Sequence, residues 1–258
     1  MKILVIGDVT SPRGVAHLCD ALWKFREKNK IDFCVVNGEN ASFITGISAD
    51  LADKLLRSGA DVITGGNHTM QNRMAYTALE ERRELVRPIN FGDSAPGRGY
   101  TIVDTSNGYR ALVINAMGNV YIEPCLDNPY PYINRALLEA KGKYDLAILD
   151  IHAEATGEKL AIGHAYDGKI NIVFGTHTHV PTADQQILPK GTGYVTDVGM
   201  CGESGGILGM DAEGIVARMK TRLPVKYTPA KGDCSADGVI FTFDTTSRRV
   251  VKVERVKL

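Results

Sequence analysis

The chain has 258 residues, with 30 acidic and 30 basic side chains and a hydrophobic fraction of 44%. This balanced charge argues against a protein whose main task is to bind long nucleic acid, because such binding needs an excess of basic surface. No apolar stretch approaches the roughly 20 residues that span a bilayer, and the N-terminus lacks the features of a signal peptide, so we expect a cytoplasmic protein without a membrane partner.

The first quarter of the chain alternates short apolar runs with segments of helical periodicity. Apolar runs predict strands at residues 3–6, 33–36 and 62–64. Between the first two strands, apolar side chains recur at helical spacing, at Val15, Leu18, Cys19 and Leu22. A second helix is predicted to begin after Ser48, which can cap it, and to end at Gly59.

The rest of the chain combines further strands with hairpins. Buried strands are predicted at residues 146–151 and 170–174. Three hairpins are predicted around Asn107-Gly108, Lys190-Gly191 and Ser247-Arg248, from the segment pairs 100–104 with 111–114, 187–189 with 194–196, and 239–243 with 250–256. No repeat or linker interrupts this order. We therefore expect one α/β domain over residues 1–258, with two mixed β-sheets packed face to face and helices on the outside.

Polar residues follow five of the predicted strands, at the point where each strand ends. These residues are Asp8, Glu39, Asn40, Asn67, His68, His152, His177 and His179. The carboxyl ends of strands in α/β sheets converge on one crevice, so the side chains should meet there. Their types are those of metal ligands. Each one alone has an ordinary explanation as a turn residue, a surface charge or a hydrogen-bonded histidine, and we interpret His17 and His164 as surface or packing residues.

The ordered motifs carry a family resemblance. The series Gly7-Asp8, Gly38-Glu39-Asn40, Gly66-Asn67-His68, His152 and residues 175–179 resembles the calcineurin-like metallophosphoesterases, whose usual pattern is D-x-H, GD, GNH, H and GHxH. It is most similar to the YmdB-like 2′,3′-cyclic nucleotide phosphodiesterases, which carry Glu-Asn in the second motif. Residues 150–156 and 196–200 also resemble that branch. Thr10 stands where the wider superfamily has a histidine ligand, and the loop 10–14, a candidate substrate contact, differs slightly from the branch.

The resemblance implies a four-layer αββα sandwich and two divalent metal ions per chain. One ion is expected at Asp8, Glu39, Asn40 and His179, and the other at Glu39, Asn67, His152 and His177. Glu39 would bridge the ions, and Asn40 would replace the missing histidine. A metal-bound hydroxide is expected to attack phosphorus. The ligand types suit iron or manganese, with zinc as an alternative.

The expected activity is hydrolysis of a small cyclic nucleotide, with His68 as the general acid. For His68, a hydrogen-bonding role beside the ligands is the alternative. Three other functions stay open: a phosphomonoesterase, an RNA-directed nuclease of the same fold, and a metal-binding regulatory protein with little turnover. The odd number of cysteines, with no C-x-x-C pair, disfavours a disulfide framework or a cysteine zinc site. A Cys201 nucleophile stays open but has no activating base nearby in the sequence, and the sequence leaves the oligomeric state open.

Overall fold

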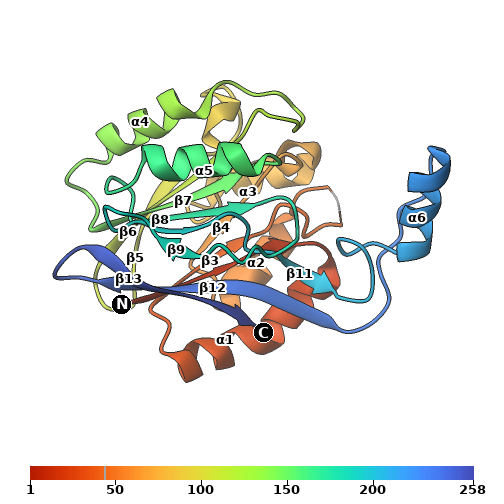
Figure 1. Cartoon of the computed structure of the whole chain (residues 1–258), viewed down its shortest axis with the longest axis horizontal. Helices are drawn as coiled ribbons and strands as arrows, with labels where there is room; N and C mark the ends of the chain where they lie inside the picture. Colours follow the sequence, from red (N-terminus) through yellow and green to blue (C-terminus); the bar gives the residue numbers. More distant parts are fainter. Residues whose placement is uncertain (44) are drawn as a thin grey trace.

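The computed structural model describes residues 1–43 and 45–258, and two β-sheets form its centre (Figure 1). The strands of the first sheet are β1 (Lys2–Ile6), β2 (Asp8–Val9), β3 (Phe33–Asn37), β4 (Val62–Thr64), β11 (Met200–Glu203), β12 (Cys234–Asp244) and β13 (Arg249–Lys257). Their order is β2-β11-β12-β1-β3-β4, and β13 pairs with β12. The strands β1, β3 and β4 run parallel, so their carboxyl ends lie at one edge.

The second sheet has a parallel centre and antiparallel edges. Its strands are β5 (Tyr100–Asp104), β6 (Arg110–Met117), β7 (Leu146–His152), β8 (Ile172–Thr176), β9 (Gln186–Ile187) and β10 (Gly193–Val195). Their order is β5-β6-β7-β8-β10-β9, with β6, β7, β8 and β10 parallel. All three predicted hairpins form, as the antiparallel pairs β5–β6, β9–β10 and β12–β13. Both sheets are therefore mixed, as predicted.

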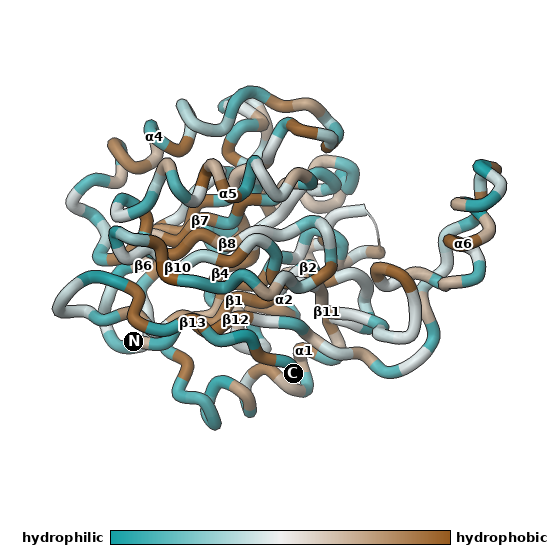
Figure 2. Tube along the Cα trace, in the orientation of Figure 1, coloured by the Kyte–Doolittle hydropathy of each residue, from teal (hydrophilic) through white to brown (hydrophobic). Residues whose placement is uncertain are grey.

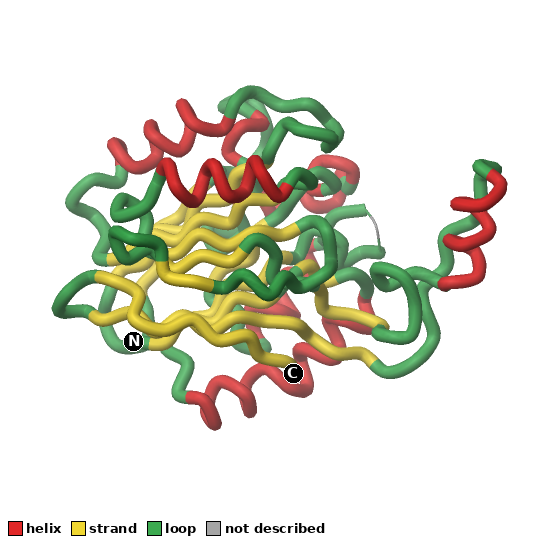
Figure 3. The backbone as a smooth tube through the Cα atoms, viewed as in Figure 1, coloured by secondary structure: helices red, strands yellow, loops and turns green. Residues whose placement is uncertain are grey.

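Helices cover the outer faces of both sheets (Figure 3). Their bounds are α1 (Pro12–Asn29), α2 (Ala49–Arg57), α3 (Tyr76–Glu81), α4 (Pro129–Glu139), α5 (Thr156–Ala165) and α6 (Ala212–Thr221), with short 3-10 turns η1 (Thr69–Gln71), η2 (Arg73–Ala75) and η3 (Ile89–Phe91). Successive side chains of β1 point to opposite faces. Ile3 and Val5 pack into the core between the sheets, whereas Leu4 and Ile6 pack against α1 and α2.

A third core lies on the far face of the second sheet. There, Leu149 and Ile151 of β7 pack with Ile133 of α4 and Ile162 of α5. The most apolar stretches accordingly lie along the central strands (Figure 2). This order of layers, helix–sheet–sheet–helix, confirms the predicted four-layer αββα arrangement.

Element boundaries follow local side-chain chemistry. The Ser48 side chain accepts a hydrogen bond from the Leu51 backbone N–H, which confirms the predicted cap of α2. Strand β8 begins at Ile172, two residues later than predicted, and extends to Thr176. Strands β2 and β11 were not predicted, because runs of two and four residues are too short to show periodicity.

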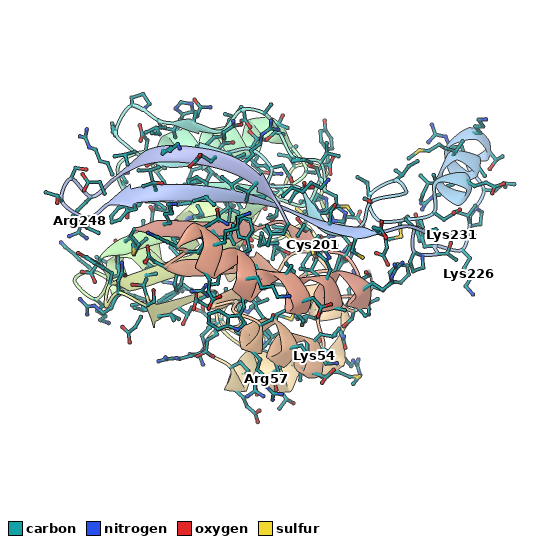
Figure 4. The ribbon with its side chains drawn as sticks, turned by 90° about the horizontal axis from the view of Figure 1, so that it is seen from below. Lys54, Arg57, Cys201, Lys226, Lys231 and Arg248 are labelled. Atoms are coloured by element: carbon teal, nitrogen blue, oxygen red, sulfur yellow. The ribbon has the colours of Figure 1, made fainter. Side chains whose placement is uncertain are left out.

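A segment that carries α6, Lys226 and Lys231 projects from the body (Figures 1 and 4). None of the ten described residues of α6 is buried. Among the helices of residues 1–43 and 45–258, none combines the length and the apolar character needed to cross a membrane.

Candidate metal centre

The predicted site residues come together where the carboxyl ends of strands from both sheets meet. Asp8 follows β1, Glu39 follows β3, and Asn67 follows β4, all in the first sheet, whereas His152 ends β7 and His177 follows β8 in the second. The backbone N–H of His177 donates to Asp8 Oδ2 over 3.1 Å, which joins the two edges directly. The site thus lies where two packed sheets meet rather than within one open sheet, because face-to-face packing aligns their carboxyl ends.

Three possible metal-ligand atoms surround Nε2 of the His152 imidazole. Its Nε2 lies 2.9 Å from Asn67 Oδ1, 3.1 Å from His177 Nδ1 and 3.6 Å from Glu39 Oε1. Atoms bound about 2.1 Å from a common ion lie about 3–3.5 Å from one another, so this spacing fits a shared ion. Glu39, His152 and His177 alone already form a group that could hold a metal ion.

A second group of possible metal-ligand residues lies next to the first, and the two groups share Glu39. His179 Nε2 lies 3.8 Å from Asp8 Oδ1 and 3.4 Å from Asn40 Nδ2, and that Asn40 nitrogen is 2.6 Å from Glu39 Oε1. Within the described residues, Asp8 Oδ1 and Asn40 Oδ1 are buried without a hydrogen-bond partner. Buried oxygens rarely stay unpaired, because desolvation costs free energy. A cation bound beside Glu39 would satisfy both of these unpaired oxygens.

The two histidines that follow β8 lie on a turn. Strand β8 ends at Thr176, and the φ angles are 100° at His177 and 64° at His179. Such angles are unusual for residues other than glycine and cost about 1–3 kcal/mol each. The turn nevertheless directs both rings toward the other site residues.

The electrostatic environment of the cluster favours neutral imidazoles and one firmly ionised carboxylate. Burial lowers the pKa of His152, His177 and His179, which keeps their nitrogen lone pairs free for a metal. Burial raises the pKa of Glu39, but the neighbouring His152 and hydrogen bonds from His68 outweigh it and lower the value to about 2. Burial, together with the charges of Asp197 and Glu39, raises the pKa of Asp8 well above its usual range.

A hydrogen-bond chain fixes which nitrogen of His152 faces the cluster. The Thr176 hydroxyl donates to Asp150 Oδ1 over 2.8 Å and lies 2.9 Å from His152 Nδ1. Because that hydroxyl proton goes to Asp150, Nδ1 of His152 carries the proton that Thr176 accepts, and Nε2 keeps its lone pair. No role was predicted for Thr176 or Asp150 from the sequence. Asp150 lies in the segment 150–156 and Thr176 in the segment 175–179, which both carry the family resemblance, but neither pattern indicated this hydrogen-bond chain.

His68 contacts Glu39 twice. Its backbone N–H donates to Glu39 Oε2 over 2.9 Å, and its Nδ1 lies 2.9 Å from Glu39 Oε1. This geometry agrees with the hydrogen-bonding alternative left open above. The His68 side chain is also 27% exposed, whereas the Glu39 side chain is fully buried. A molecule in solution can therefore reach the His68 ring.

Cys201 and Thr10 are engaged elsewhere. The Cys201 side chain is buried, its Sγ lies 3.4 Å from the Gly14 carbonyl oxygen, and burial raises the pKa of the thiol. A thiol in that state is a poor nucleophile. The Thr10 hydroxyl donates to the Cys201 carbonyl oxygen over 3.3 Å. His164 is exposed on α5, and His17 lies on α1 with Nε2 3.2 Å from the Leu258 carbonyl oxygen, as expected for surface and packing residues.

Comparison with known proteins agrees with this arrangement. A family model described as "YmdB-like protein" matches residues 4–256. The chain belongs to the YmdB-like family. The 2′,3′-cyclic-nucleotide 2′-phosphodiesterase of Bacillus subtilis (strain 168), a relative, is 44% identical over 256 residues, which cover 99% of this chain and 96% of the relative.

Two solved structures of related proteins share the whole fold. A protein of Thermus thermophilus matches with a TM-score of 0.92 and 34% identity, covering 100% of this chain and 99% of its own. A Mycoplasma pneumoniae phosphatase matches with a TM-score of 0.90 and 31% identity, covering 100% and 93%. The resemblance inferred from the strand-end motifs is therefore confirmed.

Proposed function

We propose that this YmdB-like chain is a metal-dependent phosphodiesterase that hydrolyses 2′,3′-cyclic nucleotides, acting as one domain of residues 1–258. One observation carries the proposal: Asn67, His177 and Glu39 direct donor atoms at Nε2 of His152 from separate strands of two sheets. The 44% identity to the Bacillus subtilis cyclic-nucleotide phosphodiesterase supports the substrate class.

Two divalent ions per chain fit the donor set. Asp8, Asn40 and His179 would hold one ion, Asn67, His152 and His177 the other, and Glu39 would contact both. A shared carboxylate reduces the repulsion between two cations, and the bound ions would activate water and stabilise charge on the phosphate. Imidazole, amide and carboxylate donors without thiolate suit iron or manganese, with zinc as the alternative.

The protein's own residues orient the reaction. Thr176 and Asp150 keep Nε2 of His152 available, and the buried Glu39 carboxylate holds the His68 ring through Nδ1. In hydrolysis, a water oxygen bonds to phosphorus while one bond from phosphorus to a ribose oxygen breaks. The departing ribose oxygen takes up a proton, and we assign its delivery to the accessible His68.

The test combines metal analysis with a substrate panel. Purified protein is expected to contain two divalent ions per chain and to prefer 2′,3′-cyclic AMP over p-nitrophenyl phosphate and a short RNA. Preference for p-nitrophenyl phosphate would identify a phosphomonoesterase, and preference for RNA a nuclease. Fully metal-loaded protein with no turnover on any of the three would favour a regulatory protein instead.

A further inference from the structure

A buried ion pair lies directly behind the turn that carries His177 and His179. Lys159 of α5 has a fully buried side chain, and Asp197, which follows β10, is 1% exposed. Lys159 Nζ lies 2.7 Å from Asp197 Oδ2. Neither residue belongs to the donor set of the candidate metal centre. Removing two charges from water costs free energy, so a buried ion pair is stable only where further hydrogen bonds offset that cost. The other hydrogen bonds of Lys159 and Asp197 therefore indicate what the pair does.

Both partners bind the backbone of the turn, on either side of His177. Lys159 Nζ donates to the carbonyl oxygen of Thr176 over 2.7 Å. Asp197 Oδ2 accepts from the backbone N–H of Thr178 over 3.2 Å and from its hydroxyl over 2.8 Å. The pair thus anchors the residue before His177 and the residue after it.

These hydrogen bonds hold the backbone in a conformation that is intrinsically unfavourable. His177 and His179 both have positive φ angles, which cost free energy for any residue other than glycine. The contacts of Lys159 and Asp197 with the residues on either side of His177 offset part of this cost. Asp197 also neutralises Lys159, so that a buried ammonium near the cluster does not repel a cation there.

We propose that Lys159 and Asp197 are positioning residues, which hold residues 176–179 in metal-binding geometry before any ion binds. This inference rests on the metal centre proposed above. Residues that orient metal ligands through hydrogen bonds typically change metal affinity or activity about 10–100-fold when they are replaced.

Two variants of graded severity test this role. Thr178→Val removes one hydrogen-bond donor to Asp197 and leaves the ion pair in place, whereas Lys159→Met removes the cation. The matched control is Arg26→Met, which removes the partly buried ion pair between Arg26 of α1 and Asp61, whose charged atoms lie 2.8 Å apart. The Mn²⁺ dissociation constant of metal-free protein is measured by titration, and folding by thermal circular dichroism.

Thr178→Val and Lys159→Met are expected to bind Mn²⁺ about 10–100-fold more weakly than wild type, and excess Mn²⁺ should restore turnover. Arg26→Met should lower the melting temperature and leave Mn²⁺ affinity unchanged. Folded variants that bind Mn²⁺ as tightly as wild type overturn the inference, as does an equal loss of affinity in Arg26→Met. If Lys159→Met does not fold, Thr178→Val decides. Wild-type protein that binds no Mn²⁺, Fe²⁺ or Zn²⁺ would instead refute the proposed function.

Discussion

The carboxamide oxygen of Asn67 lies 2.9 Å from Nε2 of His152, although 85 residues separate them and they come from different sheets. Because Thr176 accepts the Nδ1 proton of His152, Nε2 presents a lone pair to the lone pairs of that oxygen. Two such acceptors facing each other are unfavourable unless a cation lies between them. The geometry of this pair therefore favours metal binding.

Removal of the metal is expected to abolish activity and preserve most of the fold. Three apolar clusters, between and outside the sheets, hold the structure together without the site residues. Circular dichroism before and after a chelator should show similar secondary structure with a lower melting temperature, because bound ions stabilise the native state. Complete loss of structure on chelation would mean that the metal is structural first.

Replacing Glu39 by Gln should lower turnover by at least about 100-fold, because a neutral amide cannot offset the repulsion between two cations. Metal content should fall below two ions per chain, which elemental analysis measures. Glu80→Gln, at an exposed position, is the matched control and should keep both ions. Unchanged turnover in Glu39→Gln would reject the bridging role.

His68→Ala should keep both ions and reduce turnover by about 10²–10⁴-fold on a cyclic nucleotide. The loss should be smaller on bis-p-nitrophenyl phosphate, whose phenolic leaving group departs without a proton. The informative measurement is the ratio of the two losses in kcat. Equal losses would point to a role in holding Glu39, which lies 2.9 Å from the ring, and a lost ion would make His68 a ligand.

Gly66→Ala should weaken metal binding, whereas Gly157→Ala should increase the stability of the folded protein. A Cβ atom at Gly66 would clash with Nε2 of His152, so the ring would have to leave its position. A Cβ at Gly157, in the first turn of α5, meets nothing within 4 Å. Metal affinity should therefore fall in Gly66→Ala only, while Gly157→Ala should be stabilised by up to about 1 kcal/mol. Full affinity in Gly66→Ala would contradict the observed packing.

Cysteine labelling should depend on burial and on pH. Burial raises the pKa of the Cys34 and Cys201 thiols, so both should stay protonated as the pH rises through the ordinary value of about 8.5. Cys125 is exposed and should therefore be labelled by iodoacetamide faster than the two buried thiols. Mass spectrometry of native protein at pH 7 and pH 9 measures this. Rapid labelling of Cys201 at pH 7 would reopen the thiol nucleophile.

Local features of the structure could be predicted from the sequence because they depend on neighbouring residues. Ser48 caps α2 through a hydrogen bond to Leu51, three residues away. The turn around Asn107-Gly108 joins two antiparallel strands, in which successive side chains point to opposite faces of the sheet. Asp8, Glu39 and His152 could be named as site residues because each lies at the carboxyl end of an apolar strand, where parallel strands bring polar groups together.

Only the tertiary structure decided which partners these residues meet. Ile3 and Leu4 are adjacent apolar residues that point to opposite faces of β1, so the sequence indicates that both faces of the strand are buried. It does not indicate that a second sheet covers one face and α1 the other. The contact between Lys159 and Asp197 could not be predicted, because the two residues are 38 positions apart and no local pattern pairs them, although Asp197 lies in the segment 196–200 that resembles the family. Contacts between distant side chains depend on how the layers pack, and packing responds to shape and volume across the whole core rather than to any local pattern.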